Sequence, residues 1–185
     1  MIFLETRRLI LRNVAPRDAA AIYDYRNSEV CARYQRGQTR TRSGIDALVQ
    51  RRRNDLLSLD APALLAIALK ETDELVGEIV VMPQDGTISL GYTISYLHHR
   101  KGYAFEALSA LLAMLHERFP SQDFVCFTDP ENRPSMALLQ KLGNQDLGYA
   151  PKIHARMFGK WLRPDTRAEL RQAAQEHSSH SAGTP

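Results

Sequence analysis

The spacing of apolar positions changes along the chain, and each change predicts an element. Residues 8–12 alternate weakly between polar and apolar side chains and predict a strand, and Pro16 opens a helical stretch that runs through Tyr25. The apolar residues of 45–57 return at an irregular helical spacing and predict a second helix. A strand followed by helices therefore opens the fold.

The middle of the chain has the pattern of strands. Residues 63–69, 74–82 and 87–96 form three extended segments, and Asp85-Gly86 stands between the last two. Asp-Gly between two strand-like runs is a strong signal for a tight hairpin. We therefore expect an antiparallel meander in this region.

Helical and extended patterns alternate after the meander. The spacing predicts a helix over 104–119 that Pro120 ends, and then a strand over 124–127. Pro130 opens a further helix, for which Gly143 is a suitable C-terminal stop. Strand and helix in alternation, joined to a meander, indicate a mixed α/β (α+β) fold with a central sheet.

The composition is that of one globular domain. Of 185 residues, 44% are hydrophobic and 24% are charged, which excludes a disordered or fibrous chain. We expect one domain over residues 1–170 and a flexible tail over 171–185, where Ser, His, Gly and Thr displace apolar residues. Apolar runs such as 61–69 are far shorter than the roughly 20 residues of a membrane span, so no membrane partner is expected.

Several chemistries find no support in the sequence. The two cysteines are far apart, and neither they nor His98-His99 show metal-ligand spacing, so we expect no metal. With no secretory leader in the sequence, this cysteine usage predicts a cytoplasmic protein. No nucleophile elbow, P-loop or dinucleotide glycine motif is present. The net charge of +3 does not by itself demand nucleic acid, which is not expected as a partner.

One junction concentrates charge and glycine. The segment 92–107 runs from a predicted strand through a short basic loop into a helix. Such a loop presents backbone N–H groups, the positive end of the helix dipole and the cations Arg100 and Lys101 to one point. Gly102 would let the backbone approach phosphates, and Ala104 would keep the first helical turn clear of them. The pattern fits a pyrophosphate site, although an ordinary strand-to-helix turn with a solvated Arg-Lys pair would have the same sequence.

The same loop resembles the acetyl-CoA-binding motif of the GNAT acetyltransferases, Q/R-x-x-G-x-G/A. Its six places are taken by His99, Arg100, Lys101, Gly102, Tyr103 and Ala104. The opening residues 5–12 are similar to the N-terminal strand of the RimJ/RimL-type branch, which contains ribosomal-protein N-terminal acetyltransferases. Further agreement with that branch comes from Gly91-Tyr92, Glu106-Ala107, Asn132-x-x-Ser135-x-x-Leu138 and Lys141-Leu142-Gly143. The similarity spans residues 4–161 and implies a GNAT fold, a twisted mixed central sheet with helices on both faces.

The resemblance implies an acetyl-CoA-dependent N-acetyltransferase. A primary amine, from a protein N-terminus or a small molecule, would attack the thioester directly, and CoA would leave as a thiol. Backbone groups near Tyr92 and Ile94 would pair with the pantetheine and the acetyl carbonyl. Asn132 would contact the pantetheine or sulfur, and Ser135 would protonate the sulfur, because Leu139 stands where many members have a tyrosine. Both polar residues could instead be simple helix caps.

The proton acceptor and the amine remain open at this point. Glu78 in an apolar strand is the candidate base, although it could face solvent, and an α-amine with a pKa of about 8 needs no dedicated base. A cluster of arginines either forms a solvated face or attracts an acidic acceptor. Its members are Arg33, Arg36, Arg40, Arg42, Arg51, Arg52 and Arg53.

The sequence also departs from the family pattern. His99 replaces Gln, Arg or Trp, Arg100 stands where glycine is common, and Asn144 stands where phenylalanine is preferred. Residues 162–167 lack the apolar run of the usual last strand. The alternative function is a non-catalytic basic module on the GNAT scaffold that binds RNA or the ribosome. The sequence leaves a monomer and a homodimer equally open.

Overall fold

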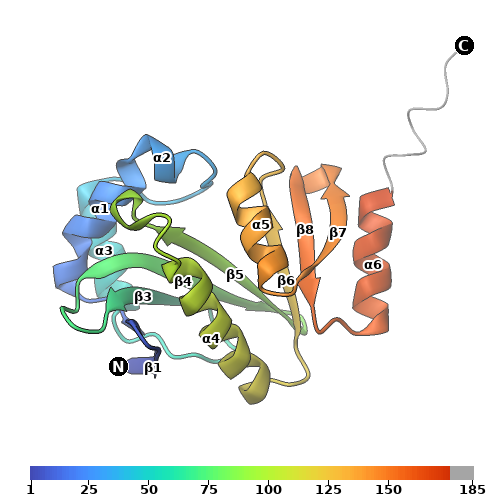
Figure 1. Ribbon diagram of the computed structural model, residues 1–185, viewed down its shortest axis with the longest axis horizontal. Helices are drawn as coiled ribbons and strands as arrows, with labels where there is room; N and C mark the ends of the chain where they lie inside the picture. The colour runs from blue at the N-terminus through green and yellow to red at the C-terminus, as the bar shows by residue number, and fades with distance from the viewer. Residues whose placement is uncertain (176–185) are drawn as a thin grey trace, which may run out of the picture. The chain divides into compact units, whose positions relative to one another are not determined.

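The computed structural model describes residues 1–175, and their contacts divide them into two compact units (Figure 1). The first unit contains residues 1–83 and 90–120, and the second contains 84–89 and the described residues from 121 onward. Strand β5 (Thr87–Ile94) contributes its first residues to the second unit and its last residues to the first. The expected single domain over residues 1–170 stays a prediction, because two compact units of one chain can belong to one domain.

The strands of the first unit follow one another in an antiparallel ladder. They are β1 (Ile2–Glu5), β2 (Leu9–Asn13), β3 (Ala63–Leu69), β4 (Leu75–Gln84) and the end of β5, in that order. Strand β3 is apolar throughout because both of its faces are covered. At the turn between β4 and β5, Asp85 and Gly86 have φ angles of 44° and 81°, as a tight two-residue hairpin requires. The predicted meander is therefore confirmed.

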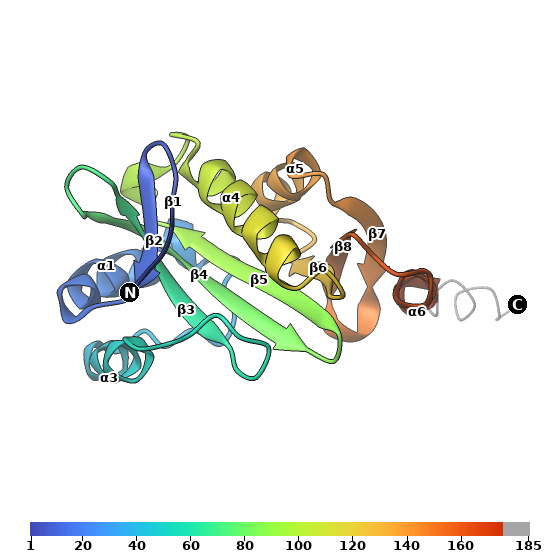
Figure 2. The same cartoon turned by 90° about the horizontal axis from the view of Figure 1, so that it is seen from below.

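Helices cover both faces of these strands (Figure 2). Helices α1 (Ala19–Asn27), α2 (Glu29–Ala32) and α3 (Arg42–Arg52) pack on one face, and α4 (Tyr103–Arg118) lies on the other. Short 3-10 turns, η1 (Pro16–Asp18) and η2 (Tyr96–His98), precede α1 and follow β5. Ile22, Tyr25 and Ile45 are buried in one core cluster with Leu64 and Ala66 of β3. This core fixes α1 and α3, between which the loop of residues 33–41 runs.

The second unit contains the one parallel strand pair reported for the described residues. Strand β6 (Asp123–Thr128) pairs in parallel with the start of β5, at Thr87 and Ile88. On its other side β6 pairs antiparallel with β8 (Ala155–Lys160). Strand β8 in turn pairs antiparallel with β7 (Gln145–Ala150). Helix α5 (Arg133–Lys141) follows β6, and α6 (Pro164–Gln175) packs its Leu170 and Ala174 against the cluster of Leu147, Ala150 and Met157. A parallel pair within otherwise antiparallel strands confirms the mixed sheet.

Several predicted boundaries need correction. The second predicted helix ends at Arg52 rather than at residue 57, because residues 53–57 turn away towards β3. The helix assigned to Pro130 begins at Arg133, with Asn132 as its N-cap. The last strand, expected after Trp161, lies before it as β8, so the run that residues 162–167 lack is supplied by 155–160.

The C-terminal prediction is wrong in part. Residues 171–175 form the end of α6 instead of a tail, because the helix buries apolar side chains on β7. The rest of the predicted tail, 176–185, lies outside the described residues. The sequence patterns also missed β1, α2, β7, β8, α6 and η3 (Pro151–Ile153). None of the helices within residues 1–175 is long and apolar enough to cross a bilayer.

Candidate active site

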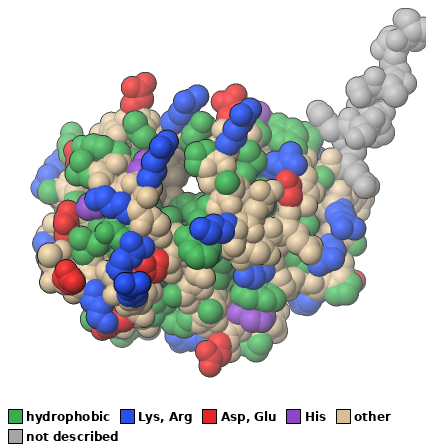
Figure 3. All heavy atoms as spheres, viewed as in Figure 1, with side chains coloured by type: hydrophobic (Ala, Val, Ile, Leu, Met, Phe, Trp, Pro, Cys, Tyr) green, Lys and Arg blue, Asp and Glu red, His purple; other side chains and the backbone are tan. Residues whose placement is uncertain are grey.

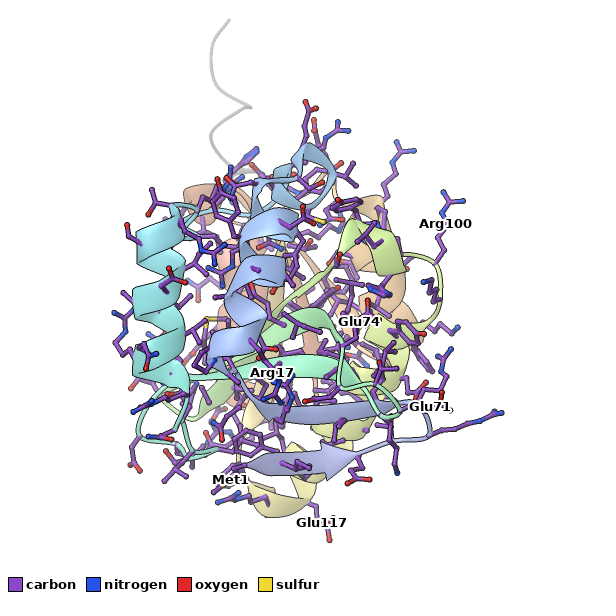
Figure 4. All side chains as sticks on the ribbon, turned by 90° about the vertical axis from the view of Figure 1, so that its left-hand side faces the viewer. Met1, Arg17, Glu71, Glu74, Arg100 and Glu117 are labelled. Atoms are coloured by element: carbon purple, nitrogen blue, oxygen red, sulfur yellow. The ribbon has the colours of Figure 1, made fainter. Side chains whose placement is uncertain are left out.

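The loop between β5 and α4 has the backbone of an anion site. Arg100 and Gly102 both have positive φ angles, 61° and 79°, and Gly102 is the N-cap of the 16-residue α4. Because glycine has no side chain to cap the helix, the first-turn N–H groups of α4 face outward. A Cβ at Gly102 would meet only the far end of Arg8, 3.4 Å away. Arg100 and Lys101 are exposed, and Arg100 points away from the loop (Figure 4).

A charged clamp holds this loop in place. The Glu106 carboxylate, on the first turn of α4, accepts hydrogen bonds from Thr6 Oγ1 at 2.7 Å, Arg8 N at 2.8 Å and Arg8 Nε at 2.7 Å. Arg8 NH1 donates to the Lys101 carbonyl at 2.9 Å, and its guanidinium lies 4.7 Å from the ring centroid of Tyr103. The turn between β1 and β2 therefore braces the loop that precedes α4.

The clamp also sets the charge of Glu106. Partial burial alone would raise the pKa of this carboxyl, but hydrogen bonds from Thr6 and Arg8 and the Arg8 charge outweigh burial and lower it. Glu106 is therefore an anion at neutral pH and remains one well into the acid range. The loop backbone depends on that charge.

The far edge of β5 carries backbone groups that an extended ligand can use. Ser95 N donates to Val76 O at 2.9 Å, so Thr93 and Ser95 face β4 while the groups of Tyr92 and Ile94 point to the opposite edge. The predicted donor positions therefore lie on one edge. Backbone groups along the edge of a strand can bind an extended ligand in the way that they bind another strand.

Side chains already hold both carbonyls on that edge. The Tyr92 carbonyl accepts from Gln35 Nε2 at 3.1 Å. The Ile94 carbonyl accepts from Cys31 Sγ at 3.4 Å and lies 2.9 Å from His99 Nε2. His99, predicted among the cofactor-loop residues, thus ties the loop to the strand end. That the backbone groups of Tyr92 and Ile94 pair with a bound acyl chain stays a prediction.

Glu78 is buried in an ion pair. It is 1% exposed, so the alternative that it faces solvent is wrong. Its two carboxylate oxygens each accept from the buried Arg26 guanidinium, from Nε and NH2, both at 2.9 Å. The Ser95–Val76 register places Glu78 opposite Thr93 of β5. Its role as a general base stays a prediction, and the pairing means that such a base would first have to part from Arg26.

Asn132 and Ser135 lie in the second unit at the start of α5. Asn132 Oδ1 accepts from Ser135 N at 3.2 Å, which confirms the helix-capping interpretation for Asn132. The cap uses the amide oxygen and leaves Nδ2 available as a donor. Ser135 is partly exposed one turn into the helix. Its role as an acid towards the leaving sulfur stays a prediction.

Other polar groups near the loop are structural. His98 is buried, with Nε2 3.2 Å from Glu74 and Nδ1 3.4 Å from Lys101 Nζ. Within residues 1–175, no group of three or more His, Cys, Asp or Glu side chains is placed to hold a metal ion.

Sequence reasoning quoted Glu106 as part of a motif but gave it no role. A carboxylate one turn into a helix that follows a basic loop was the available signal, together with the arginine pair at residues 7 and 8. Gln35 and Arg26 were missed altogether. Nothing in their local pattern marks them, because their partners lie 57 and 52 residues away along the chain.

Comparisons with known proteins agree with this arrangement. The family model described as "Acetyltransferase (GNAT) domain" matches residues 8–145. The match covers well over half of the chain, and the chain therefore belongs to the GNAT acetyltransferases.

Two curated relatives are similar over most of their length. The uncharacterized N-acetyltransferase p20 of Bacillus licheniformis is 30% identical over 154 residues, covering 78% of this chain and 83% of the relative. The uncharacterized N-acetyltransferase YnaD of Bacillus subtilis (strain 168) is 26% identical over 151 residues, covering 80% and 86%.

Solved structures share the fold at lower identity. A GNAT-family acetyltransferase from Bacillus anthracis has a TM-score of 0.72 at 22% identity, covering 86% of this chain and 96% of that one. The Salmonella typhimurium acetyl transferase that modifies the N-terminal serine of the 50S ribosomal protein L7/L12 has a TM-score of 0.73 at 16% identity, covering 88% and 100%.

Membership of this family defines the reaction class. The chain is an acetyl-CoA-dependent N-acetyltransferase, and acetyl-CoA is its donor substrate. The loop from Arg100 to Ala104 fits that donor, because it combines outward N–H groups, a glycine without steric hindrance and two exposed cations.

Proposed function

We propose that the chain transfers the acetyl group to a primary amine, of a peptide N-terminus or a small molecule, by direct attack on the thioester. The observation that supports this most is the braced loop at the start of α4, where Gly102 presents first-turn N–H groups outward. The phosphates of the donor would bind there. The acyl end would run along the edge of β5 that carries the amides of Tyr92 and Ile94.

Each step makes a demand that named groups can meet. The amine lone pair forms the C–N bond, the C–S bond breaks, and the thiolate takes a proton for which Ser135 is the proposed donor. The N–H groups of Tyr92 and Ile94 would stabilise the oxyanion. The ammonium proton leaves to Glu78 or to water. Water suffices for an α-amine, whose pKa is about 8.

The decisive experiment measures acetyl-CoA-dependent release of thiol with a panel of peptide N-termini, polyamines and aminoglycosides. We expect at least one amine to raise thiol release well above the rate without acceptor, with the acetylated amine detected by mass in equal amount. Thiol release that no amine increases would contradict the proposed reaction.

Ser135→Ala tests the proton donor. Loss of a general acid typically costs 10² to 10⁴ in rate, which is about 3 to 5 kcal/mol. We therefore expect kcat to fall by at least 100-fold with little change in the affinity for acetyl-CoA. Asn132→Ala serves as the comparison, because it removes the α5 cap while leaving the hydroxyl in place. A large loss of affinity with kcat preserved would make Ser135 a pantetheine contact instead.

The alternative, a basic module that binds RNA or the ribosome, has weaker support. On the face shown in Figure 3, Lys and Arg side chains are spread among acidic and apolar ones instead of forming one stripe. A protein that bound RNA through counterion release would lose affinity steeply as salt rises. Salt-insensitive transfer to a small amine would favour the enzyme.

A further inference from the structure

A small cavity lies against β3 and β4, on the face covered by α1 and α3. Its volume is about 200 Å³. Its polar lining comes from Arg26, Gln38, Thr39 and Arg52, and Leu48 and Val80 are among its apolar walls. These residues come from α1, α3, the loop before α3 and β4. A volume this size holds a group of about one amino-acid residue, well below the 300–1,000 Å³ of sites for larger ligands.

The two arginines keep donor capacity towards this cavity. Arg26 uses Nε and NH2 for Glu78 and one bond from NH1 for the Thr39 carbonyl at 3.2 Å, which leaves N–H groups on both terminal nitrogens. Arg52 donates from NH1 to Pro62 O at 2.8 Å and lies 3.6 Å from Asp55, which leaves Nε and NH2. Such donors on a planar fork bind carboxylates through two parallel bonds.

Gln38 gives the cavity its second polar end. Its Oε1 is buried and has no hydrogen-bond partner within residues 1–175. Its Nε2 lies 3.4 Å from both Gln35 Oε1 and Thr93 Oγ1. A buried acceptor without a donor costs free energy that a ligand N–H can recover. Thr93 stands between Tyr92 and Ile94 on β5, so this acceptor is next to the strand proposed to hold the acyl group.

We propose that the cavity binds the carboxylate of the acceptor and that the acceptor is a small amino carboxylate. The carboxylate would accept from Arg52 and from the spare N–H groups of Arg26, and the amine would donate to Gln38 Oε1. This inference rests on the proposed transfer to a primary amine and specifies its substrate class. It also divides the arginine cluster, because Arg52 lines the cavity while its neighbours Arg51 and Arg53 are exposed.

The test uses matched acceptors. For each of several L-amino acids, kcat/KM is measured for the acid, its primary amide and its decarboxylated amine, by thiol release and mass. We expect the acid to be preferred at least 10-fold over the amide. That preference would run against intrinsic reactivity, because the amide has the less basic amine and more of it is unprotonated at neutral pH.

Three variants locate the preference. Arg52→Gln should reduce the preference for the acid to less than threefold. Gln38→Glu, which places a carboxylate beside the two arginines, should reverse the preference in favour of the decarboxylated amine. Arg51→Gln, a change at the adjacent exposed arginine, should leave the preference as in the unaltered protein.

A binding measurement separates this inference from the proposed reaction. Without acetyl-CoA, millimolar amino acid should raise the melting temperature of the unaltered protein and of Arg51→Gln, but not that of Arg52→Gln. Turnover with equal rates for acid and amide would overturn the carboxylate site while keeping the transfer reaction. Thiol release that no amine increases would instead overturn the proposed reaction, and absence of the melting shift would then overturn the carboxylate site as well.

Discussion

Two loops of the first unit adjoin strand β5. The hydrogen bonds that hold them differ in length and in the charge of the bonded groups. The loop from residue 95 to 102 is fixed by charge-assisted bonds of 2.7 to 2.9 Å that converge on Glu106 and Lys101. The loop from residue 33 to 41 contacts β5 through the neutral amides of Gln35 and Gln38, at 3.1 and 3.4 Å. A charge-assisted bond to this loop, from Arg26 NH1 to the Thr39 carbonyl, is 3.2 Å long and does not involve β5. Hydrogen bonds to ionised groups are roughly twice as strong as neutral ones.

The difference suits the roles that we propose for the two loops, donor binding for residues 95–102 and acceptor binding for residues 33–41. Because the donor substrate is always acetyl-CoA, a loop with one fixed backbone conformation is suited to binding it. An acceptor that is recognised by a few contacts is better bound by a loop whose side chains can adjust on binding. The comparison therefore predicts that changes in the first loop alter donor binding and changes in the second alter acceptor binding.

The largest expected effect is on the donor loop itself. Gly102→Asp adds bulk and negative charge where we propose that the phosphates of acetyl-CoA bind, in a residue with φ of 79°. Acetyl-CoA at 100 times its Kd stabilises a protein by about 2.7 kcal/mol, and this variant should lose the whole melting shift. Gly102→Ala should keep part of it, because it adds backbone strain of about 1–2 kcal/mol without charge. An undiminished shift in the Asp variant would contradict the loop assignment.

Removing the clamp should have the next largest effect. Glu106→Ala frees Arg8, Thr6 and the loop backbone, so we expect KM for acetyl-CoA to rise about 10-fold, or about 1.4 kcal/mol, with the acceptor KM unchanged. Glu106→Gln keeps the shape of the side chain and loses its charge. Its KM for acetyl-CoA should therefore lie between those of the unaltered protein and Glu106→Ala. Equal changes in both KM values would show that the two loops are not independent.

The charge of Glu106 predicts a pH dependence. Because the pKa of this carboxyl is lowered in the folded protein, its contribution to stability is complete above the unfolded value of about 4.3 and is lost as pH falls through the lower folded value. The melting temperature of the unaltered protein should exceed that of Glu106→Gln by about 2–4 °C at pH 7, and the gap should close below pH 4. Thermal scans of both proteins from pH 3 to 7 measure this gap. A difference in melting temperature that stays constant over this pH range would contradict the role of the Glu106 charge in the clamp.

The smallest effect is expected at the acceptor loop. Gln35→Leu removes the neutral bond to the Tyr92 carbonyl and should raise the acceptor KM by about threefold, or about 0.7 kcal/mol, with less effect on acetyl-CoA. Gln35→Glu would test the same contact with a group that cannot donate. A tenfold rise in the KM for acetyl-CoA in either variant would place Gln35 on the donor side.

The sequence was sufficient to predict those elements whose signal lies in neighbouring residues. The Asp85-Gly86 turn and the meander follow from residue type and spacing, and the structure has them where they were predicted. Helix α6 was missed because its polar sequence becomes helical only by packing apolar side chains on β7. Strands β7 and β8 were missed because glycines and charges interrupt their alternation.

The candidate site shows the same difference between residues that are neighbours in the sequence and residues that meet only in the fold. The residues of the donor loop were found because they are consecutive. The groups that fix them were not, because Glu106 is 98 residues from Arg8 and Gln35 is 57 residues from Tyr92. Glu78 was found as an isolated carboxylate, yet its partner Arg26 could not be inferred without the packing of α1 on β4. Pairing across the fold is what a single sequence does not encode locally.

The thiol contact on the Ile94 carbonyl has a practical consequence for kinetics. Both cysteines are buried, and burial raises the pKa of Cys31 above its usual value despite hydrogen bonds that act in the opposite direction. Colorimetric disulfide reagents react with exposed thiolates, so the enzyme itself should contribute little background colour when released CoA is titrated. A slow residual signal from Cys31 would then measure the rate at which this buried thiol becomes accessible to the reagent.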